Sequence, residues 1–375
     1  MTPYTHGGDV LTARARFGGD VLDCSANLNP LGMPPAVQAA AAAAAADSAR
    51  YPDPLCRALR AAIAAHDGVA PEQVLCGGGA AELIFRLAYA LRPRRALITA
   101  PAFSEYEEAL TAAGCAVTRH PLRRENRFDV DGGLLDVIAP GVELVFLCTP
   151  NNPTGAVYSE ESLRKLAALA VEHDFFVVAD EIYEKLVYDG AEHFSVASIS
   201  QEVRDRTVTV NGFSKAYAMT GWRIGYAAAR ADVIKGIMAV QSQTTSATSA
   251  ISQKAAVEAL RGPQHDLEVM VEEFRRRKDY VVDRLNRIPG ITCPDVKGAF
   301  YVYPDVQLYL GKSFGGRKIE TAVELCQYLL DEALISTVPG EAYNVPGKIR
   351  ISYSNSMENL EKALDRMEQA LAALH

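Results

Sequence analysis

The sequence predicts an α/β protein in which a mainly parallel sheet is covered by helices, followed by a smaller α+β domain. From residue 74 to residue 210, short runs that are apolar throughout alternate with amphipathic stretches. Strands of this kind, each separated by a helix, are typical of parallel sheets that are buried on both faces. The length of 375 residues allows a large domain with a smaller one, and 49% hydrophobic with 22% charged residues is an ordinary globular composition.

Composition and charge argue against several classes of protein. The net charge of −8 comes without a basic stripe, so we expect no nucleic-acid partner. The first ten residues, MTPYTHGGDV, lack the pattern of a signal peptide, and no apolar run reaches the length of a membrane span. The seven cysteines are scattered without a Cys-x-x-Cys or Cys/His cluster, which predicts reduced, mostly buried thiols and no metal site. The chain is therefore expected to be cytoplasmic.

The positions of proline and alanine predict two helices near the N-terminus. Residues 1–33 are loop-rich and contain one short apolar run, Val21–Cys24. The alanine run Ala39–Ala46 after a proline pair could be low-complexity filler, but alanine is the strongest helix former and proline fits a first turn. A packed helix is therefore predicted, ended by Tyr51-Pro52-Asp53-Pro54 and followed by a helix at Leu55–His66.

The alternating pattern in the middle of the chain defines the sheet. The predicted strands are Val74–Cys76, Ala96–Ala100, Ala116–His120, Leu144–Cys148, Phe175–Ala179 and Val208–Val210. The predicted helices between them are Ala80–Leu91, Phe103–Ala113 and Glu160–His173. Ligands of such sheets bind at the carboxyl ends of the strands, so functional residues are expected directly after them.

The last part of the chain predicts the smaller domain, with a boundary near residue 262. Helices are expected at Ala247–Leu260 and Asp266–Arg287. The basic run Arg275–Lys278 could suggest an anionic partner, but the acidic residues around it favour a solvated helical face. The remaining strands are expected near Ala299–Tyr303, Ile335–Val338 and Ile349–Tyr353, and the remaining helices at Ile319–Ala333 and Met357–Leu374.

The stretch Thr207–Tyr226, TVTVNGFSKAYAMTGWRIGY, carries the strongest chemical signal. Lys215 is flanked by small and aromatic residues, a poor setting for a solvated lysine. A desolvated lysine lowers its pKa, and a neutral amine can attack an aldehyde to give a Schiff base. Ser214 and Arg223 suit a phosphate, Arg223 through its planar fork of donors. A lysine in a loop is ordinarily a surface residue, so this interpretation depends on the other motifs.

Three further motifs follow predicted strands. Gly77–Ala81 opens a helix, where backbone amides and the helix dipole can bind a phosphate, although glycine-rich turns are common. Pro150–Gly155, PNNPTG, is either a plain turn or a source of side-chain donors. Asp180 and Tyr183, in DEIY, place an acid at the carboxyl end of a strand, with capping of the next segment as the alternative.

Together these groups match what a phosphorylated pyridine aldehyde requires. A carboxylate keeps the ring nitrogen protonated, so that the ring can accept electrons from a substrate's α-carbon. An amide and a phenol can hold the ring hydroxyl, and Phe103 is the candidate to stack on the ring. Backbone amides, Ser214 and Arg223 can hold the phosphate.

The motifs cover nearly all of the chain, which resembles the fold-type-I pyridoxal-phosphate enzymes of the class I/II aminotransferase superfamily. The resemblance implies a mainly parallel seven-stranded sheet and pyridoxal 5′-phosphate as cofactor. Lys215 would be the Schiff-base lysine, Asp180 the partner of the ring nitrogen, and Tyr183 the third catalytic residue. The cofactor contacts that it implies are Gly79, Ala80, Ala81, Phe103, Asn152, Asp180, Tyr183, Ser214, Lys215 and Arg223.

The resemblance also implies how substrate and subunits bind. Arg350, in KIRIS, would hold the substrate α-carboxylate, with Asn152 beside it. Tyr51 would reach the phosphate of the neighbouring subunit's cofactor, which implies a homodimer with shared active sites. The chain then divides into an N-terminal substrate-side segment (1–33), a large cofactor-binding domain (34–262) and a small C-terminal domain (263–375).

Two parts of the chain resemble different members. Residues 1–155 are similar to threonine-phosphate decarboxylases, and more distantly to histidinol-phosphate aminotransferases, through HGGD (6–9), SANLNPLGMP (25–34), RYPDP (50–54), LRPRRALI (91–98) and FLCTPNNPTG (146–155). Residues 156–375 are similar to bacterial aspartate-type aminotransferases through DEIYEKLVYDG (180–190), NGFSKAYAMTGWRIGY (211–226), KGAFYVYP (297–304) and VPG (338–340). The resemblance changes from one group to the other at NNPTG, as it would in a natural or engineered recombinant chain.

Each part lacks a charge that its relatives use. The phosphate-substrate enzymes carry an arginine about fourteen residues before the carboxylate arginine, where this chain has Ser336. The aspartate enzymes carry a lysine in the glycine-rich turn, where this chain has Ala80. An unpartnered phosphate or second carboxylate costs several kcal/mol in a desolvated site, so strong selectivity for either substrate is not expected. His6, Gly7 and Asn27, which would line the substrate side in the decarboxylases, are present.

Three functions are compatible with these residues. An aminotransferase would move an amino group between an L-amino acid and a 2-oxoacid, with Lys215 moving the α-proton. A carbon–carbon lyase would decarboxylate O-phospho-L-threonine with the same cofactor but a turned substrate, and a pseudoenzyme or regulator would bind cofactor or partner without turnover. We favour the aminotransferase, because Lys215 and Arg350 both lie in the aspartate-type part.

Overall fold

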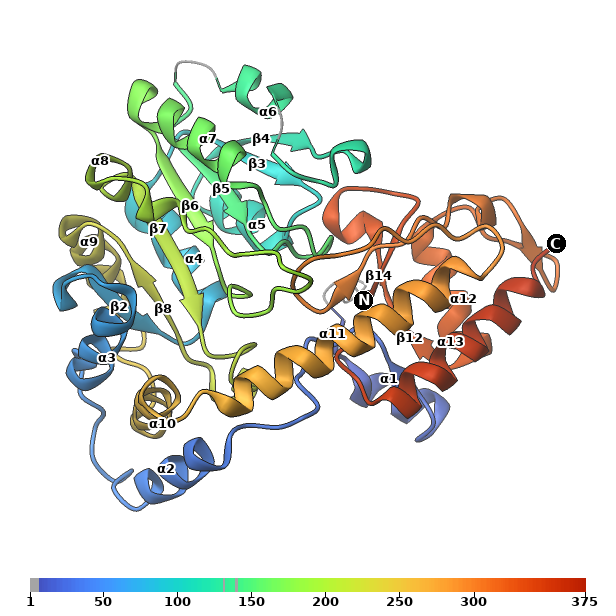
Figure 1. Cartoon of the computed structure of the whole chain (residues 1–375), viewed down its shortest axis with the longest axis horizontal. Helices are drawn as coiled ribbons and strands as arrows, with labels where there is room; N and C mark the ends of the chain where they lie inside the picture. Colours follow the sequence, from blue (N-terminus) through green and yellow to red (C-terminus); the bar gives the residue numbers. More distant parts are fainter. Residues whose placement is uncertain (1–6, 131, 139–140) are drawn as a thin grey trace.

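Seven strands form the central sheet in the order β2-β8-β7-β6-β5-β3-β4, and only β8 runs antiparallel to its neighbours (Figure 1). Their bounds are β2 Val74–Gly77, β3 Arg95–Ala100, β4 Ala116–Pro121, β5 Leu144–Cys148, β6 Phe176–Asp180, β7 Thr207–Gly212 and β8 Gly225–Ala228. The computed structural model describes residues 7–130, 132–138 and 141–375. His6 lies outside these residues.

Alternate side chains of the strands pack on helices at the two faces of the sheet. One face, with Leu75, Val178 and Ala227, packs on α4 Ala80–Leu91, α5 Ser104–Ala112 and α9 Ala231–Ser242. The neighbouring residues Val74 and Val177 face the opposite side. The helices there are α2 Pro35–Ala45, α3 Arg57–Asp67, α6 Gly132–Val137, α7 Glu160–His173, α8 Gln201–Arg204 and α10 Ala250–Arg261. Burial on both faces explains why these strands are apolar throughout.

The smaller part begins with the long helix α11, which runs from the large part to the C-terminal elements (Figure 1). Its elements are α11 His265–Asn286, β9 Tyr301–Val302, β10 Ser313–Phe314, β11 Arg317–Lys318, α12 Ala322–Ala333, β12 Ile335–Ser336, β13 Val338–Pro339, β14 Ile349–Ser352 and α13 Met357–Ala372. The N-terminal α1 Val10–Phe17 and β1 Leu22–Asp23 also belong here, because β1 pairs in parallel with β12. The division of the chain at residues 33 and 262 stays a prediction.

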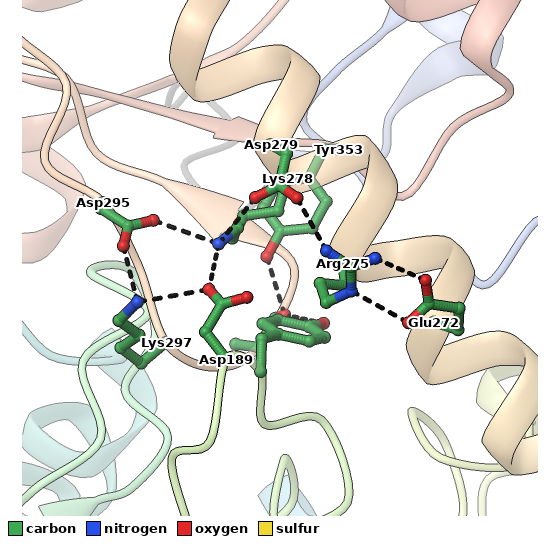
Figure 2. Close-up of polar contacts among 10 residues, drawn as sticks. Asp189, Glu272, Arg275, Lys278, Asp279, Asp295, Lys297 and Tyr353 are labelled. Atoms are coloured by element: carbon green, nitrogen blue, oxygen red, sulfur yellow. Dashed lines mark hydrogen bonds and ion pairs between the residues drawn. The ribbon is translucent and has the colours of Figure 1, made fainter.

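A buried lysine ties α11 to two other segments (Figure 2). Lys278 is 2% exposed, and its ammonium lies 2.9 Å from Asp279, 3.2 Å from Asp295 and in closer contact with Asp189. Lys297 pairs with the same two distant carboxylates, at 3.2 Å from Asp189 and 2.7 Å from Asp295. Burial alone would lower the pKa of Lys278, but the three carboxylates raise it to about 12. The network joins the loop that follows β6 to the entry of the smaller part.

The basic run on α11 corrects one prediction. Arg275 and Arg276 pair with glutamates on the exposed side, as a solvated helical face requires. Arg277 and Lys278, however, are only 4% and 2% exposed, so that expectation is wrong for both. A helix turns about once every 3.6 residues, so four consecutive side chains cannot all face solvent when one side of the helix packs on the protein.

Most predicted elements are close to those observed, but several observed ones, including β8, α6 and α8, were not predicted. Helix α1 lies in a stretch expected to be loop; Asp9 caps it, and Gly18 ends it with a φ of 86°. Helix α9 was not assigned, although its buried Val233, Ile234 and Ile237 follow helical spacing. The strand expected at residues 335–338 is divided into β12 and β13. The seven cysteines are free and buried, as predicted. None of the helices in the described part of the chain combines the length and apolar character of a membrane span.

Candidate active site

Lys215 lies three residues after β7, at the carboxyl end of the sheet. Its Nζ donates to the Asn27 carbonyl at 3.3 Å and lies 5.9 Å from the centroid of the Phe300 ring. Burial lowers the pKa of Lys215 to about 7, and the positive charges of Arg350 and Arg223 act in the same direction. Asp180 opposes the shift. A large neutral fraction of the amine therefore exists at neutral pH, as its apolar flanks predicted.

Asp180 ends β6 and is 4% exposed. Its Oδ2 accepts a hydrogen bond of 2.6 Å from the Tyr106 hydroxyl, and its Oδ1 accepts one of 3.2 Å from the Ile182 amide. Burial raises the pKa of Asp180 to about 6, and the bond from Tyr106 limits the shift. Tyr106 is itself fixed by stacking on Phe146, with ring centroids 4.8 Å apart. The carboxyl group is thus held in one orientation.

Arg350 on β14 is 1% exposed and lies against the ring of Tyr301, 4.5 Å from its centroid. It donates to Asn152 Oδ1 at 2.9 Å and to the Ser25 carbonyl at 2.7 Å. Its Nε is buried without a hydrogen-bond partner among the described residues. Tyr183 joins this group, because its hydroxyl lies 2.5 Å from that of Tyr301. Arg350 Nε is therefore a buried donor that is available to a ligand.

The glycine-rich turn and Arg223 meet at the start of α4. Gly79 caps this helix with a φ of 104°, and a Cβ there would lie 2.6 Å from Arg223 Nη2. A Cβ at Gly225 would lie 3.0 Å from the Ala80 amide nitrogen, so the strand also approaches the turn closely. Ser214, which directly precedes Lys215, is 7% exposed. A helix N-terminus beside a guanidinium is a suitable place for an anion such as phosphate.

The structure gives the remaining predicted residues different surroundings. Phe103 packs edge-on against Tyr106, with ring centroids 5.7 Å apart, and Tyr106 in turn donates to Asp180. Gly7 lies so close to Ser25 that a Cβ would approach it to 2.7 Å. Asn27 Oδ1 is buried without a partner among the described residues. Ala81 is half-buried in the first turn of α4.

Tyr51 is the predicted residue that a single chain does not bring to the site. It lies between α2 and α3 and is 100% exposed. A fully exposed tyrosine side chain is unusual in a monomer, because its large ring is ordinarily half-buried.

Three site residues were not predicted: Tyr106, Tyr301 and Ser25. Tyr106 lies three residues after Phe103, so helical spacing places the two on one side of α5, but it does not reveal the contact with Asp180. Tyr301 stands in the KGAFYVYP segment, and Ser25 opens the SANLNP segment, but both were treated only as parts of a resemblance. Their roles depend on contacts between residues far apart in sequence.

A further cluster lies next to Asp180 in sequence. Oxygen and nitrogen atoms of Glu181, Glu184 and His193 come within 4.8 Å of one another. Glu181 accepts hydrogen bonds from Ser195 at 2.8 Å and makes one of 3.1 Å with His193. Burial would lower the pKa of His193, but the bond and charge of Glu181 raise it. The sequence did not predict this cluster.

Known proteins resemble the chain over most of its length. Residues 19–367 match the family model "Aminotransferase class I and II". The chain is 37% identical to the aspartate aminotransferase of Bacillus sp. (strain YM-2) over 302 residues, which are 80% of this chain and 76% of that protein. It is 37% identical to the probable aspartate/prephenate aminotransferase of Aquifex aeolicus over 308 residues, again 80% of this chain and 76% of the relative.

Solved structures agree with these relatives. The aspartate aminotransferase of Rhizobium meliloti superposes with a TM-score of 0.89 at 35% identity, covering 98% of this chain and 95% of that one. The Thermus thermophilus aspartate aminotransferase with maleate gives 0.87 at 34% identity, covering 98% and 97%. The fold-type-I prediction is confirmed, whereas these relatives give no support to the threonine-phosphate decarboxylase resemblance. The chain belongs to the aminotransferase class I and II family.

Proposed function

We propose that this aminotransferase moves an amino group between an L-amino acid and a 2-oxoacid with pyridoxal 5′-phosphate as its cofactor. The observation that carries the proposal is the amine of Lys215, whose pKa is lowered to about 7 within reach of the charges of Asp180 and Arg350. A neutral amine between a carboxylate and a guanidinium suits both covalent attachment to an aldehyde and proton transfer.

The residues present fit this cofactor. Asp180 would hold the ring nitrogen, because it is a buried carboxyl whose pKa of about 6 leaves it mainly ionised at neutral pH. The absence of a side chain at Gly79 leaves Arg223 free to approach the start of α4, where the phosphate would bind. Asn152 and Tyr183 would hold the ring oxygen, with Ser214 on the phosphate and Phe103 on the ring. When bound, the cofactor supplies an acceptor for the electrons of the substrate's α-carbon.

The chain's own residues bind the substrate and move its proton. Arg350 would hold the α-carboxylate through its free donor, and burial excludes water that would compete for it. Lys215 Nζ, once neutral, can accept the proton of the α-carbon and return it to a neighbouring carbon. Asn27 and Gly7 would line the substrate side, since the Asn27 carbonyl accepts a hydrogen bond from Lys215.

We further propose a cytoplasmic homodimer with no nucleic-acid or membrane partner, in which Tyr51 completes the neighbouring subunit's site. Its full exposure in one chain supports this arrangement. Mixing Tyr51→Ala and Lys215→Ala subunits should restore activity, because each heterodimer carries one site with neither change. Random pairing gives about a quarter of the wild-type activity. If the mixture stays as inactive as its parents while both remain folded dimers, the shared site is wrong.

The reactivity of Lys215 should follow its lowered pKa. In cofactor-free protein, the rate of acylation at Lys215 should rise about tenfold per pH unit below pH 7 and level off above it, because only the neutral amine reacts. Lys165, an exposed lysine on α7, is the internal control, because its amine is in contact with water. Peptide mass mapping after short labelling measures both, and parallel profiles for the two lysines would contradict the burial argument.

Assays of two reactions test the proposed function. The purified, cofactor-loaded protein is given a panel of L-amino acids with a 2-oxoacid acceptor, and keto-acid formation is measured. Carbon dioxide release from O-phospho-L-threonine is measured in parallel. We expect transamination of several amino acids and no appreciable decarboxylation. Fast decarboxylation without transamination, or neither reaction in protein that binds the cofactor, would refute the proposal.

A further inference from the structure

Asp23, the last residue of β1, carries a carboxylate of which only one oxygen is satisfied. Its Oδ1 accepts hydrogen bonds from the Ser25 amide at 2.9 Å, the Ser25 hydroxyl at 2.6 Å and the Ala26 amide at 3.1 Å. Its Oδ2 is buried and has no hydrogen-bond partner among the described residues. A buried carboxylate oxygen without a donor is costly, so a ligand that brings a donor to this oxygen would bind favourably.

The position opposite Asp23 holds no positive charge. Asp23 and Ser336 are register partners in the parallel pair β1–β12, so their side chains project to the same face. The Ser336 hydroxyl donates to the Ser25 hydroxyl at 3.2 Å. Among the residues that the structure describes, Asp23 forms no ion pair. The acidic group is therefore flanked by two small hydroxyl side chains and left with an unused acceptor.

This segment runs beside the two groups that would hold the substrate. The Ser25 carbonyl accepts from Arg350 Nη2 at 2.7 Å, and the Asn27 carbonyl accepts from Lys215 Nζ at 3.3 Å. A substrate whose carboxylate is on Arg350 and whose α-carbon faces Lys215 thus lies along residues 25–27. The same serine that touches Arg350 through its carbonyl binds Asp23 through its hydroxyl.

We infer that Asp23 selects the side chain of the amino donor, and that the site takes L-amino acids whose side chains end in a hydrogen-bond donor, an amide or an ammonium, in preference to acidic ones. The inference rests on the proposed aminotransferase function. A donor would satisfy Asp23 Oδ2, whereas a side-chain carboxylate would meet a like charge with no cation at Ser336 or Ala80 to offset it. Sites built to bond a polar group discriminate strongly against analogues that cannot do so.

Isosteric substrate pairs test this preference. Asparagine and aspartate, and likewise glutamine and glutamate, have nearly the same shape and differ in the charge of the side chain. For the wild-type enzyme we expect kcat/KM for the amide to exceed that for the acid by at least about tenfold. In Asp23→Asn this ratio should fall to about one or below, because an amide nitrogen then replaces the unused oxygen. The change should appear mainly in KM, as expected for a contact made before the reaction.

Two other variants control the experiment. Asp20→Asn makes the same chemical change three residues away, where the side chain is 72% exposed and pairs with Arg366, and should leave the ratio unchanged. Ser336→Arg adds the missing cation and should shift the preference toward acidic or phosphorylated side chains, which keeps the inference testable if Asp23→Asn does not fold. Equal use of amides and acids by the wild type, or a ratio unaffected by Asp23→Asn, would overturn the inference. Absence of transamination with every amino acid would instead refute the proposed function.

Discussion

Replacing Lys215 by alanine should lower the rate of transamination by about 10²–10⁴-fold or more, since this is the contribution of a positioned proton-transfer group alone. The structure gives the reason in the surroundings of the amine: it is buried, its pKa is about 7, and its only hydrogen bond within the described part of the chain is to the Asn27 carbonyl. The variant should also lose the visible absorbance that depends on covalent attachment of the cofactor. Absorbance spectra and initial rates measure both effects.

Borohydride treatment of the cofactor-loaded wild type should label Lys215 and no other lysine in a peptide map. Lys165→Ala, which removes an exposed lysine paired with Glu161 on α7, is the matched control and should keep full activity and colour. A label on another lysine, or an active Lys215→Ala enzyme, would show that the catalytic lysine has been misassigned.

The second large effect concerns stability. Replacing Lys278 by alanine should lower the free energy of unfolding by about 3 kcal/mol, because removing one partner from a buried ion cluster leaves the others without compensation. Lys297→Ala is the control, since Lys297 contacts the same carboxylates but its side chain is 39% exposed; surface pairs contribute about 0–1 kcal/mol. The difference is measured from the midpoints of urea unfolding of the wild type and the two variants, provided that their m-values are equal. Equal midpoints for the two variants would refute the special role of Lys278.

The pH dependence of this network has a defined sign. Pairing with Lys278 lowers the pKa of Asp189 below the usual range of an aspartate. For Asp295, burial raises the pKa, but pairing with Lys297 and Lys278 outweighs burial and lowers it. A carboxyl with a lowered folded-state pKa adds stability above its unfolded pKa and loses it as the pH falls through the folded value. The gap between wild type and Lys278→Ala should therefore stay constant at neutral pH and shrink below about pH 4. It should shrink again at strongly alkaline pH, because the raised pKa of Lys278, about 12, adds stability that is lost as the pH rises through it.

The sequence predicted those parts of the site that lie next to a strand end. Asp180 and Lys215 follow β6 and β7 directly, and their chemistry can be read from local pattern alone. Tyr106, Tyr301 and Ser25 could not be found in this way, because each becomes a site residue through a contact that spans the chain: Tyr106 lies 74 residues from Asp180 and Tyr301 lies 118 residues from Tyr183.

The same limit explains the errors in the fold. The run Arg275–Lys278 looked solvated because its acidic neighbours in sequence could neutralise it. The carboxylates of Asp189 and Asp295 that bury Lys278 come from other segments, which no helical pattern contains. Helix α1 was missed because it packs weakly, and its Leu11 is 81% exposed. Local capping by Asp9 and Gly18 was the signal that could have found it.

The pairing of β1 with β12 has a consequence for how the protein is made. Ser25 and Arg350 are 325 residues apart in sequence, yet one hydrogen bond joins them at the centre of the site. During synthesis the N-terminal segment leaves the ribosome first and must wait for nearly the whole chain before its partners exist. Contacts of such long range form late and slowly. A chain that ends after the central sheet would therefore have no substrate site, and residues 22–25 stay without their partners Ile335, Ser336 and Arg350 until translation ends.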